Sequence, residues 1–113
     1  MLHKSKDEAA TKQNGPTCGV KEFGGIASID GADIVIDGRY PAEGYSVNDE
    51  SSFVIRVLNG TGTLAVRGGL TSLAEGDVAF VKNGEAYYFE GQNLAIFMAC
   101  TPAWNPEQYA NVG

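Results

Sequence analysis

The stretch that decides the fold is GDVAFVKNGEAYYFEG, residues 76–91. Two short, largely apolar runs flank Asn83-Gly84, a pair that favours the tight turn of a β-hairpin. Similar glycine-containing pairs punctuate residues 24–101 at intervals of about 8 to 10 residues, the spacing of an antiparallel sandwich or barrel. No long amphipathic helical pattern interrupts this rhythm. The sequence therefore predicts an all-β fold.

The chain divides into a polar tail and a single barrel domain. Residues 1–16 are polar and mixed in charge, and we expect a flexible tail in which residues 6–13 can form a short helix. Residues 17–113 then form the barrel. The predicted strands span residues 24–30, 32–38, 53–60, 61–69, 70–76, 77–84, 85–91 and 94–101, with the first hairpin turning at Asp30-Gly31.

A C-terminal extension over residues 101–113 follows the last predicted strand. It contains two prolines and the only tryptophan, Trp104. Asn105 can cap a helical turn that starts at Pro106, because asparagine is favoured at the N-cap and proline in the first turn. We expect Trp104 to fold back onto the barrel wall.

The chain is acidic and long enough for one domain. It has 113 residues and a net charge of −6, which argues against nucleic acid or an anionic membrane as the main partner. No apolar run approaches the roughly 18 residues of a membrane helix, and the N-terminal residues lack the apolar core of a signal peptide. We therefore expect a cytoplasmic protein. Free thiols are then favoured at Cys18 and Cys100 over a disulfide, the alternative that the sequence leaves open.

The order of strands and turn glycines resembles the cupin family, whose members are small double-stranded β-helix barrels of jelly-roll architecture. Their second motif runs roughly Gly, five residues, Pro-x-Gly, two residues, His, three residues, Asn. It aligns without a gap from Gly76, its first glycine, through the turn glycine Gly84. Tyr87 then takes the histidine position and Gly91 the asparagine position. The resemblance covers about residues 25–100 and implies a cupin-type jelly-roll barrel.

The first cupin motif, roughly Gly, five residues, His-x-His, three or four residues, Glu, six residues, Gly, is anchored here on Gly60. Counting back puts Phe53 at the glutamate position and Ser46 and Asn48 at the histidine positions. We prefer this anchor because a hairpin fixes register better than a loop does. Other registers place the ligand positions at Val47 and Asp49 or, counted from Gly38, at Gly44, Ser46 and Glu50. None of these registers supplies a histidine.

The residues contradict the metal chemistry that the resemblance would imply. Cupin metal sites commonly combine three imidazoles with a carboxylate, whereas the only histidine of this chain is His3, in the tail. We therefore predict a protein with no metal and no other cofactor. Asp49 and Glu50 could hold a hard cation weakly, but solvated loop carboxylates are the simpler interpretation.

Six residues are candidates for a ligand site in the barrel. Tyr87 can hydrogen-bond a ligand, or its ring can fill the space that a metal would occupy. The second interpretation is favoured by Phe53, because a phenyl group at the glutamate position makes this part of the barrel interior apolar. As a base Tyr87 is poor, since an ordinary tyrosine pKa is near 10. An Arg beside aromatic residues suits a carboxylate or a sugar, unless the loop simply packs on itself. The candidate ligand-binding residues are Arg39, Tyr40, Ser46, Asn48, Phe53 and Tyr87.

The predicted strand over residues 53–60 is largely apolar on both faces. Strand alternation separates its residues into one face with Phe53, Ile55 and Val57 and another with Val54, Arg56 and Leu58. A strand that is apolar on both sides is usually covered on both sides. We therefore expect a homodimer with Arg56 near the interface, although an N-terminal strand could also cover the outer face.

These observations favour binding over conventional metal-dependent catalysis. We expect a metal-free cupin-like protein that binds a small polar molecule, a sugar or a carboxylate, in the barrel. The first alternative is a metal-independent sugar isomerase or epimerase, in which Tyr87 acts with Tyr40 or a carboxylate. The second is a structural or regulatory homodimer with a filled barrel. No residue is assigned as catalytic, because Cys100 has no histidine to activate it and neither a Ser-His-Asp set nor a phosphate loop is present.

Overall fold

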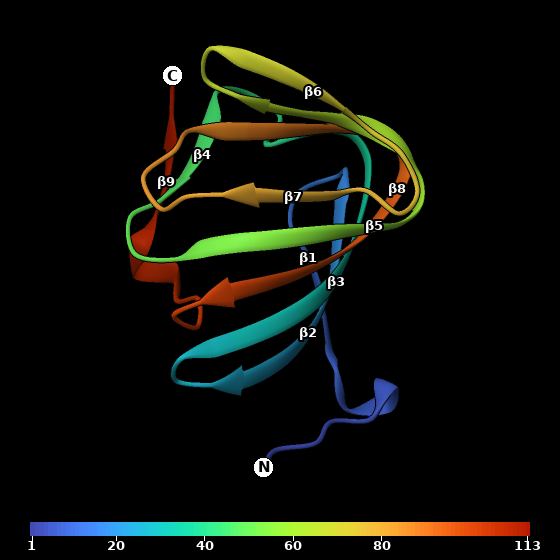
Figure 1. Ribbon diagram of the computed structural model, residues 1–113, viewed down its shortest axis with the longest axis vertical. Coiled ribbons are helices and arrows are strands. Elements are labelled where there is room, and N and C mark those ends of the chain that lie inside the picture. Colours follow the sequence, from blue (N-terminus) through green and yellow to red (C-terminus); the bar gives the residue numbers. More distant parts are fainter.

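The computed structural model describes residues 1–113 and shows nine antiparallel strands that curl into a barrel (Figure 1). Each strand pairs with its neighbours in the order β1-β2-β3-β8-β4-β9, while β5 pairs with β6, β7 and β8. The strands are β1 (Ala10–Gln13), β2 (Cys18–Ile26), β3 (Ile29–Tyr40), β4 (Tyr45–Asn48), β5 (Ser52–Val66), β6 (Gly69–Leu73), β7 (Val78–Val81), β8 (Tyr87–Thr101) and β9 (Tyr109–Val112). The predicted all-β jelly-roll barrel is thus confirmed.

Two long strands, β5 and β8, take part in both walls of the barrel. The second half of β8 pairs with β3 and with the first half of β5. The first half of β8 pairs with the second half of β5 and, at Tyr87, with Ser46 of β4. Both strands change register near Gly60 and Asn93, which have φ angles of 81° and 47°. A Cβ on Gly60 would lie 2.1 Å from the carbonyl oxygen of Asn93, so this bend requires glycine.

Three of the predicted turns are wrong. β5 and β8 run through Gly60 and Gly91, because the glycines there form bulges that bend the strands without ending them. The hairpin between β2 and β3 turns at residues 27–28, ahead of the predicted Asp30-Gly31. The anchor of the first motif therefore lies on a bulge. By contrast, the chain does turn at Asn83-Gly84 between β7 and β8, with Gly84 at a φ of 86°. The predicted hairpin is wrong, because β7 pairs with β5 and not with β8.

The N-terminal segment carries an edge strand. The helix predicted over residues 6–13 is reduced to one 3-10 turn, η1 (Lys6–Glu8). The backbone N–H of Ser5 donates to the Glu8 carboxylate at 3.2 Å, and the backbone N–H of Glu8 donates to the carbonyl oxygen of Ser5 at 3.0 Å. Residues 10–13 instead pair with β2, which offers unpaired backbone groups along its free edge. An ion pair of 3.2 Å between Lys12 and Glu22 accompanies this pairing.

The C-terminal extension folds back as predicted. A second 3-10 turn, η2 (Pro106–Gln108), begins after Asn105, whose side chain accepts a hydrogen bond of 3.2 Å from the backbone N–H of Gln108. β9 then pairs with β4, and Trp104 packs against the barrel core. Neither of the two short helices has the length or the apolarity to cross a membrane.

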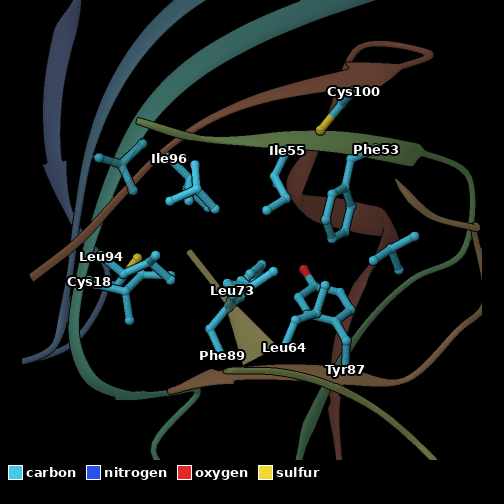
Figure 2. Close-up of a cluster of buried hydrophobic side chains, with 14 residues drawn as sticks. Cys18, Phe53, Ile55, Leu64, Leu73, Tyr87, Phe89, Leu94, Ile96 and Cys100 are labelled. Atoms are coloured by element: carbon cyan, nitrogen blue, oxygen red, sulfur yellow. The ribbon is translucent and has the colours of Figure 1, made fainter. Parts of the chain in front are cut away.

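The barrel interior is a continuous apolar core. Fourteen buried side chains from both walls form one cluster, and Figure 2 shows them meeting across the barrel. The outer surface of the β2-β3-β8-β5-β7 wall is also partly apolar. Phe80 is 78% exposed there, and Val78, Ile29 and Phe97 are exposed as well. One wall of the barrel is therefore apolar on both faces.

Candidate ligand-binding site

The pit where cupins commonly hold a metal is filled by aromatic rings. Phe53, Tyr87 and Phe89 are at most 6% exposed. Tyr87 meets Phe53 edge-on at 5.1 Å between ring centroids and Phe89 at 5.9 Å. Figure 2 shows these rings in the interior, with the Tyr87 hydroxyl pointing from one wall toward Ile55 and Phe53 on the other. Phe53 is therefore a core residue packed against Tyr87, with only 3% of its surface exposed.

Asn48 is the centre of a buried hydrogen-bond network beside this plug. Its side-chain oxygen accepts a hydrogen bond of 2.9 Å from the indole N–H of Trp104, and its amide nitrogen donates to the Tyr87 hydroxyl at 3.3 Å. Because an indole nitrogen can only donate, the Trp104 contact fixes which end of the amide faces Tyr87. Asn48 thus joins the barrel interior to the C-terminal extension.

Two further tyrosines extend the network. The Ser46 hydroxyl lies 2.7 Å from that of Tyr109, and the Tyr40 hydroxyl lies beside Tyr109. Ser46 is fully buried, whereas Tyr40, Trp104 and Tyr109 are partly exposed. We refer to Tyr40, Ser46, Asn48, Tyr87, Trp104 and Tyr109 together as the polar cluster. It has an inner layer of buried groups and an outer layer that reaches solvent.

A buried glutamine holds the extension that supplies Trp104 and Tyr109. Gln108 is 4% exposed, and its side-chain oxygen accepts hydrogen bonds from the backbone N–H groups of Glu50, at 3.1 Å, and Ser51, at 2.7 Å. Its amide nitrogen donates to the Ser51 hydroxyl at 2.9 Å. In addition, Asp30 accepts a hydrogen bond of 3.0 Å from the backbone N–H of Trp104. The extension is therefore fixed on both sides of the indole ring.

Burial keeps the phenols of Tyr40 and Tyr87 protonated. Loss of solvent raises the pKa of Tyr40 and of Tyr87 well above the ordinary value, although the hydrogen bond from Asn48 lowers that of Tyr87 in part. The Asn48 amide is the only hydrogen-bond partner of the Tyr87 hydroxyl, which accepts in that bond. Its own proton is consequently unused within the chain, and Tyr87 can act as a donor but not as a base.

The two thiols are buried and unreactive. Burial raises the pKa of Cys18 to about 11, and burial together with Asp30 raises that of Cys100 to about 12. Both cysteines are free. Cys18 pairs with Ile36, which in turn pairs with Leu94 of β8. Leu94 lies six residues before Cys100, or roughly 20 Å along the strand, so the two cysteines are too far apart for a disulfide. Free thiols, favoured from the sequence, are what the structure shows.

The structure brings four of the six predicted site residues together and separates the other two. Tyr40, Ser46, Asn48 and Tyr87 belong to the polar cluster. Phe53 lies beneath it in the core. Arg39 points away, because adjacent strand residues face opposite sides. Its guanidinium donates to the carbonyl oxygens of Pro41 and Gly44 and lies 3.9 Å from the ring centroid of Tyr88.

Sequence reasoning missed three residues of this region as site components. Trp104 and Tyr109 complete the polar cluster, and Gln108 holds them in place. The signal for Trp104 was present, since a lone tryptophan in a short polar extension needs an apolar surface and a partner for its N–H. Tyr109 and Gln108 gave no comparable signal, because their partners lie some sixty residues away along the chain.

The side chains at the expected metal positions do not suit a divalent transition metal. Ser46, Asn48 and Phe53 supply no anionic or imidazole ligand, and the raised pKa of Tyr87 disfavours a phenolate. Nowhere does the chain bring together three or more His, Cys, Asp or Glu side chains. Asp49 and Glu50 are exposed, and Glu50 accepts a hydrogen bond from Asn105.

Solved structures share this fold over nearly the whole chain. Pac13 of Streptomyces, described as a nucleoside dehydratase, has a TM-score of 0.88 in a variant with uridine, with 14% identity over 100% of this chain and 92% of that one. An RmlC-like cupin from Shewanella frigidimarina has a TM-score of 0.74 and 19% identity, covering 92% of both chains. KdgF from a Halomonas species has a TM-score of 0.73 and 14% identity, covering 87% of this chain and 92% of that one.

Sequence comparison alone gives no such relatives. No protein-family model matches the chain, and no curated protein matches it. The likeness is therefore one of three-dimensional structure, at identities of 14 to 19%. Together with the bent strands β5 and β8 and the turn glycines of the second motif, it establishes that this chain has the cupin fold.

Proposed function

We propose that the protein binds a small polar molecule, a sugar, nucleoside or carboxylate, at the polar cluster. The observation that carries this proposal is the unused phenolic proton of Tyr87, a donor that is 6% exposed and has no acceptor within the chain. A buried donor without an acceptor costs free energy, which a ligand oxygen would recover. The uridine bound to Pac13, a protein of the same fold, supports including nucleosides among the candidates.

The layering of the cluster supports a specific mode of binding. Tyr40, Trp104 and Tyr109 form the outer layer, and their rings offer flat apolar faces for a sugar or a base. Tyr87 and Asn48 lie beneath Trp104. A ligand that turns the indole away from Asn48 would gain the Asn48 carbonyl as an acceptor and the Tyr87 hydroxyl as a donor.

A metal-independent enzyme is the second candidate. The Tyr87 phenol is protonated at neutral pH, and its raised pKa makes it a weak acid that can give its proton only to a strongly basic oxygen of a leaving group or an enolate. Cys18 and Cys100 are too weakly acidic to supply a thiolate. Catalysis would therefore rest on Tyr87 as a general acid, with the base supplied by a carboxylate or by water.

A ligand screen separates binding from a purely structural barrel. The wild-type protein is first screened by thermal shift against three compound classes: nucleosides (uridine among them), hexoses and small carboxylates. Each compound that stabilises it is then titrated by calorimetry into the wild type, Tyr87→Phe and Tyr88→Phe. Tyr88 is the matched control, because it neighbours Tyr87 in sequence but stacks under Arg39 on the outer side. We expect Tyr87→Phe to weaken binding about fivefold or more, from the loss of one buried hydrogen bond, and Tyr88→Phe to leave it unchanged.

Two results would reject the proposal. The first is the absence of any stabilising compound at millimolar concentration, which favours the structural barrel. The second is equal affinity of a hit for all three proteins, which would place the ligand elsewhere. Product formation with a hit, lost in Tyr87→Phe, would instead favour the enzyme.

The protein is also proposed to act as a cytoplasmic homodimer. Two free, buried thiols suit a reducing compartment. The exposed apolar wall formed by β2, β3, β5, β7 and β8 suits a second copy of the chain.

A further inference from the structure

The outer face of the β2-β3-β8-β5-β7 wall is an apolar surface that nothing in the chain covers. Phe80 and Val78 on β7 are 78% and 48% exposed, and Phe97 on β8 is 37% exposed. Two grooves of about 420 and 920 Å³ lie side by side on this face and share Ile29 and Ala99 in their walls. Exposed apolar surface of this extent is unusual in a monomer.

Cross-strand pairing arranges this face in rows, because paired residues of a ladder project to the same side. One row contains the largest and the smallest side chains of the face. It runs Phe80, Val54, Ala99, Gly31 and Gly24 across β7, β5, β8, β3 and β2. The row therefore has the exposed phenyl ring of Phe80 at one end and open space above Gly24 at the other, while the Phe97 ring of the neighbouring row covers Gly31.

The adjacent row carries opposite charges on either side of its centre. It runs Val78, Arg56, Phe97, Asp33 and Lys21 across the same five strands. Arg56 and Asp33 form no ion pair in the chain, whose single ion pair joins Lys12 and Glu22. Both charges therefore lie next to an apolar surface without an ion pair, although Lys21 is the cross-strand neighbour of Asp33.

We infer that this face binds the same face of a second copy, about a two-fold axis that runs along β8 over Phe97. Such an axis reverses the order of each row. Arg56 of one copy then lies opposite Asp33 of the other, on both sides of the axis, and Phe97 lies opposite Phe97. Phe80 of one copy lies over the open space above Gly24 of the other. The pairings of Arg56 with Asp33 and of Phe80 with Gly24 are complementary between two identical faces, as an isologous interface requires.

The self-complementarity selects a second copy over other occupants. The N-terminal residues Met1 and Leu2 lie in the wall of the larger groove but are 117% and 52% exposed, so they border the face without covering it. An unrelated partner would have no reason to match Arg56 and Asp33 at mirrored positions. This inference goes beyond the ligand proposal and does not depend on it, because neither row of this face contains a residue of the polar cluster.

Sedimentation equilibrium on the full chain tests the interface. We expect a dimer that is weakened about 100-fold or more by Phe80→Glu, since the charge would enter an apolar interface. Leu70→Glu is the matched control, because Leu70 is 72% exposed on β6, away from this face, and should leave the dimer intact. Circular dichroism confirms that both variants fold, as expected for exposed positions.

A charge exchange tests the axis itself. Arg56→Asp and Asp33→Arg should each weaken the dimer about tenfold or more by placing like charges opposite each other, and the double variant should recover most of the loss. A monomeric wild type at 100 µM (roughly the upper range for a specific homodimer) would overturn the inference. So would a dimer that Phe80→Glu leaves intact or that Leu70→Glu dissociates. If the double variant lost as much dimer affinity as the two single variants lose together, the proposed axis would be refuted.

Discussion

Replacing Asn48 by Leu removes the centre of the polar cluster while nearly conserving volume. The substitution deletes the acceptor of the Trp104 indole N–H, at 2.9 Å, and the donor to the Tyr87 hydroxyl, at 3.3 Å. Each lost hydrogen bond costs about 1 kcal/mol, and a buried phenolic oxygen left unpaired adds about 1 to 2 kcal/mol. We therefore expect the free energy of unfolding to fall by about 2 to 4 kcal/mol. The Tm should fall with it, by about 4 °C for each kcal/mol lost.

The partner variant Tyr87→Phe should cost about 1 to 2 kcal/mol, since it leaves the Asn48 amide without an acceptor. Combined with Asn48→Leu it should cost less than the sum, by about 1 kcal/mol, because the double variant leaves neither group of that bond unpaired. Urea denaturation followed by far-UV circular dichroism and by the fluorescence of Trp104, the only tryptophan, measures all four proteins. Additivity to within about 0.3 kcal/mol would show that Asn48 and Tyr87 are not coupled and would refute the reasoning.

Three further predictions concern the scaffold. Gly60→Ala should lower the free energy of unfolding by about 2 kcal/mol or more in urea denaturation, because its Cβ meets a carbonyl oxygen; Gly68→Ala, also at positive φ but in open space, should cost about 1 kcal/mol. Gln108→Leu leaves two backbone N–H groups unpaired, so limited proteolysis should cleave the C-terminal extension faster than in the wild type. The pKa values of Cys18 and Cys100, raised to about 11 and 12, make unfolding easier at high pH, because unfolded thiols ionise from about pH 8.5 while folded ones stay neutral. The Tm should hold below that pH and fall between about pH 9 and 12, and Cys18→Ala should make the decline shallower.

Local signals were sufficient to predict the fold. Asn83-Gly84 marks a turn, and Asn105 followed by Pro106 marks a capped turn, because each depends on neighbours in sequence. Which strand β7 pairs with does not follow from the turn: β7 pairs with β5 and not with β8. Gly60 and Gly91 were misassigned for the same reason. A glycine at positive φ serves a turn and a bulge equally, and only pairing with a distant strand tells them apart.

The candidate site was predictable only in part. The motif register brought Ser46, Asn48 and Tyr87 to one place, since strand pairing carries that information. Arg39 and Tyr40 are adjacent residues of one strand, so their side chains face opposite sides of the sheet. Predicting both of them in one barrel site was therefore inconsistent with strand geometry. The contact of Trp104 with Asn48 spans a chain separation of 56 residues and follows from the folded extension, which no periodicity reveals.

The two bent strands have a consequence for how the molecule comes apart. β5 and β8 are shared by both walls, with pairs from Ser52 and Thr101 at one end to Val66 and Tyr87 at the other. Neither wall can open while the other stays intact, because each would take half of the same two strands with it. Folding must close this long ladder between segments distant in sequence, which is slow, and the result is a single cooperative unit. Amide protons of β5 and β8 should accordingly exchange with solvent only when the whole barrel unfolds.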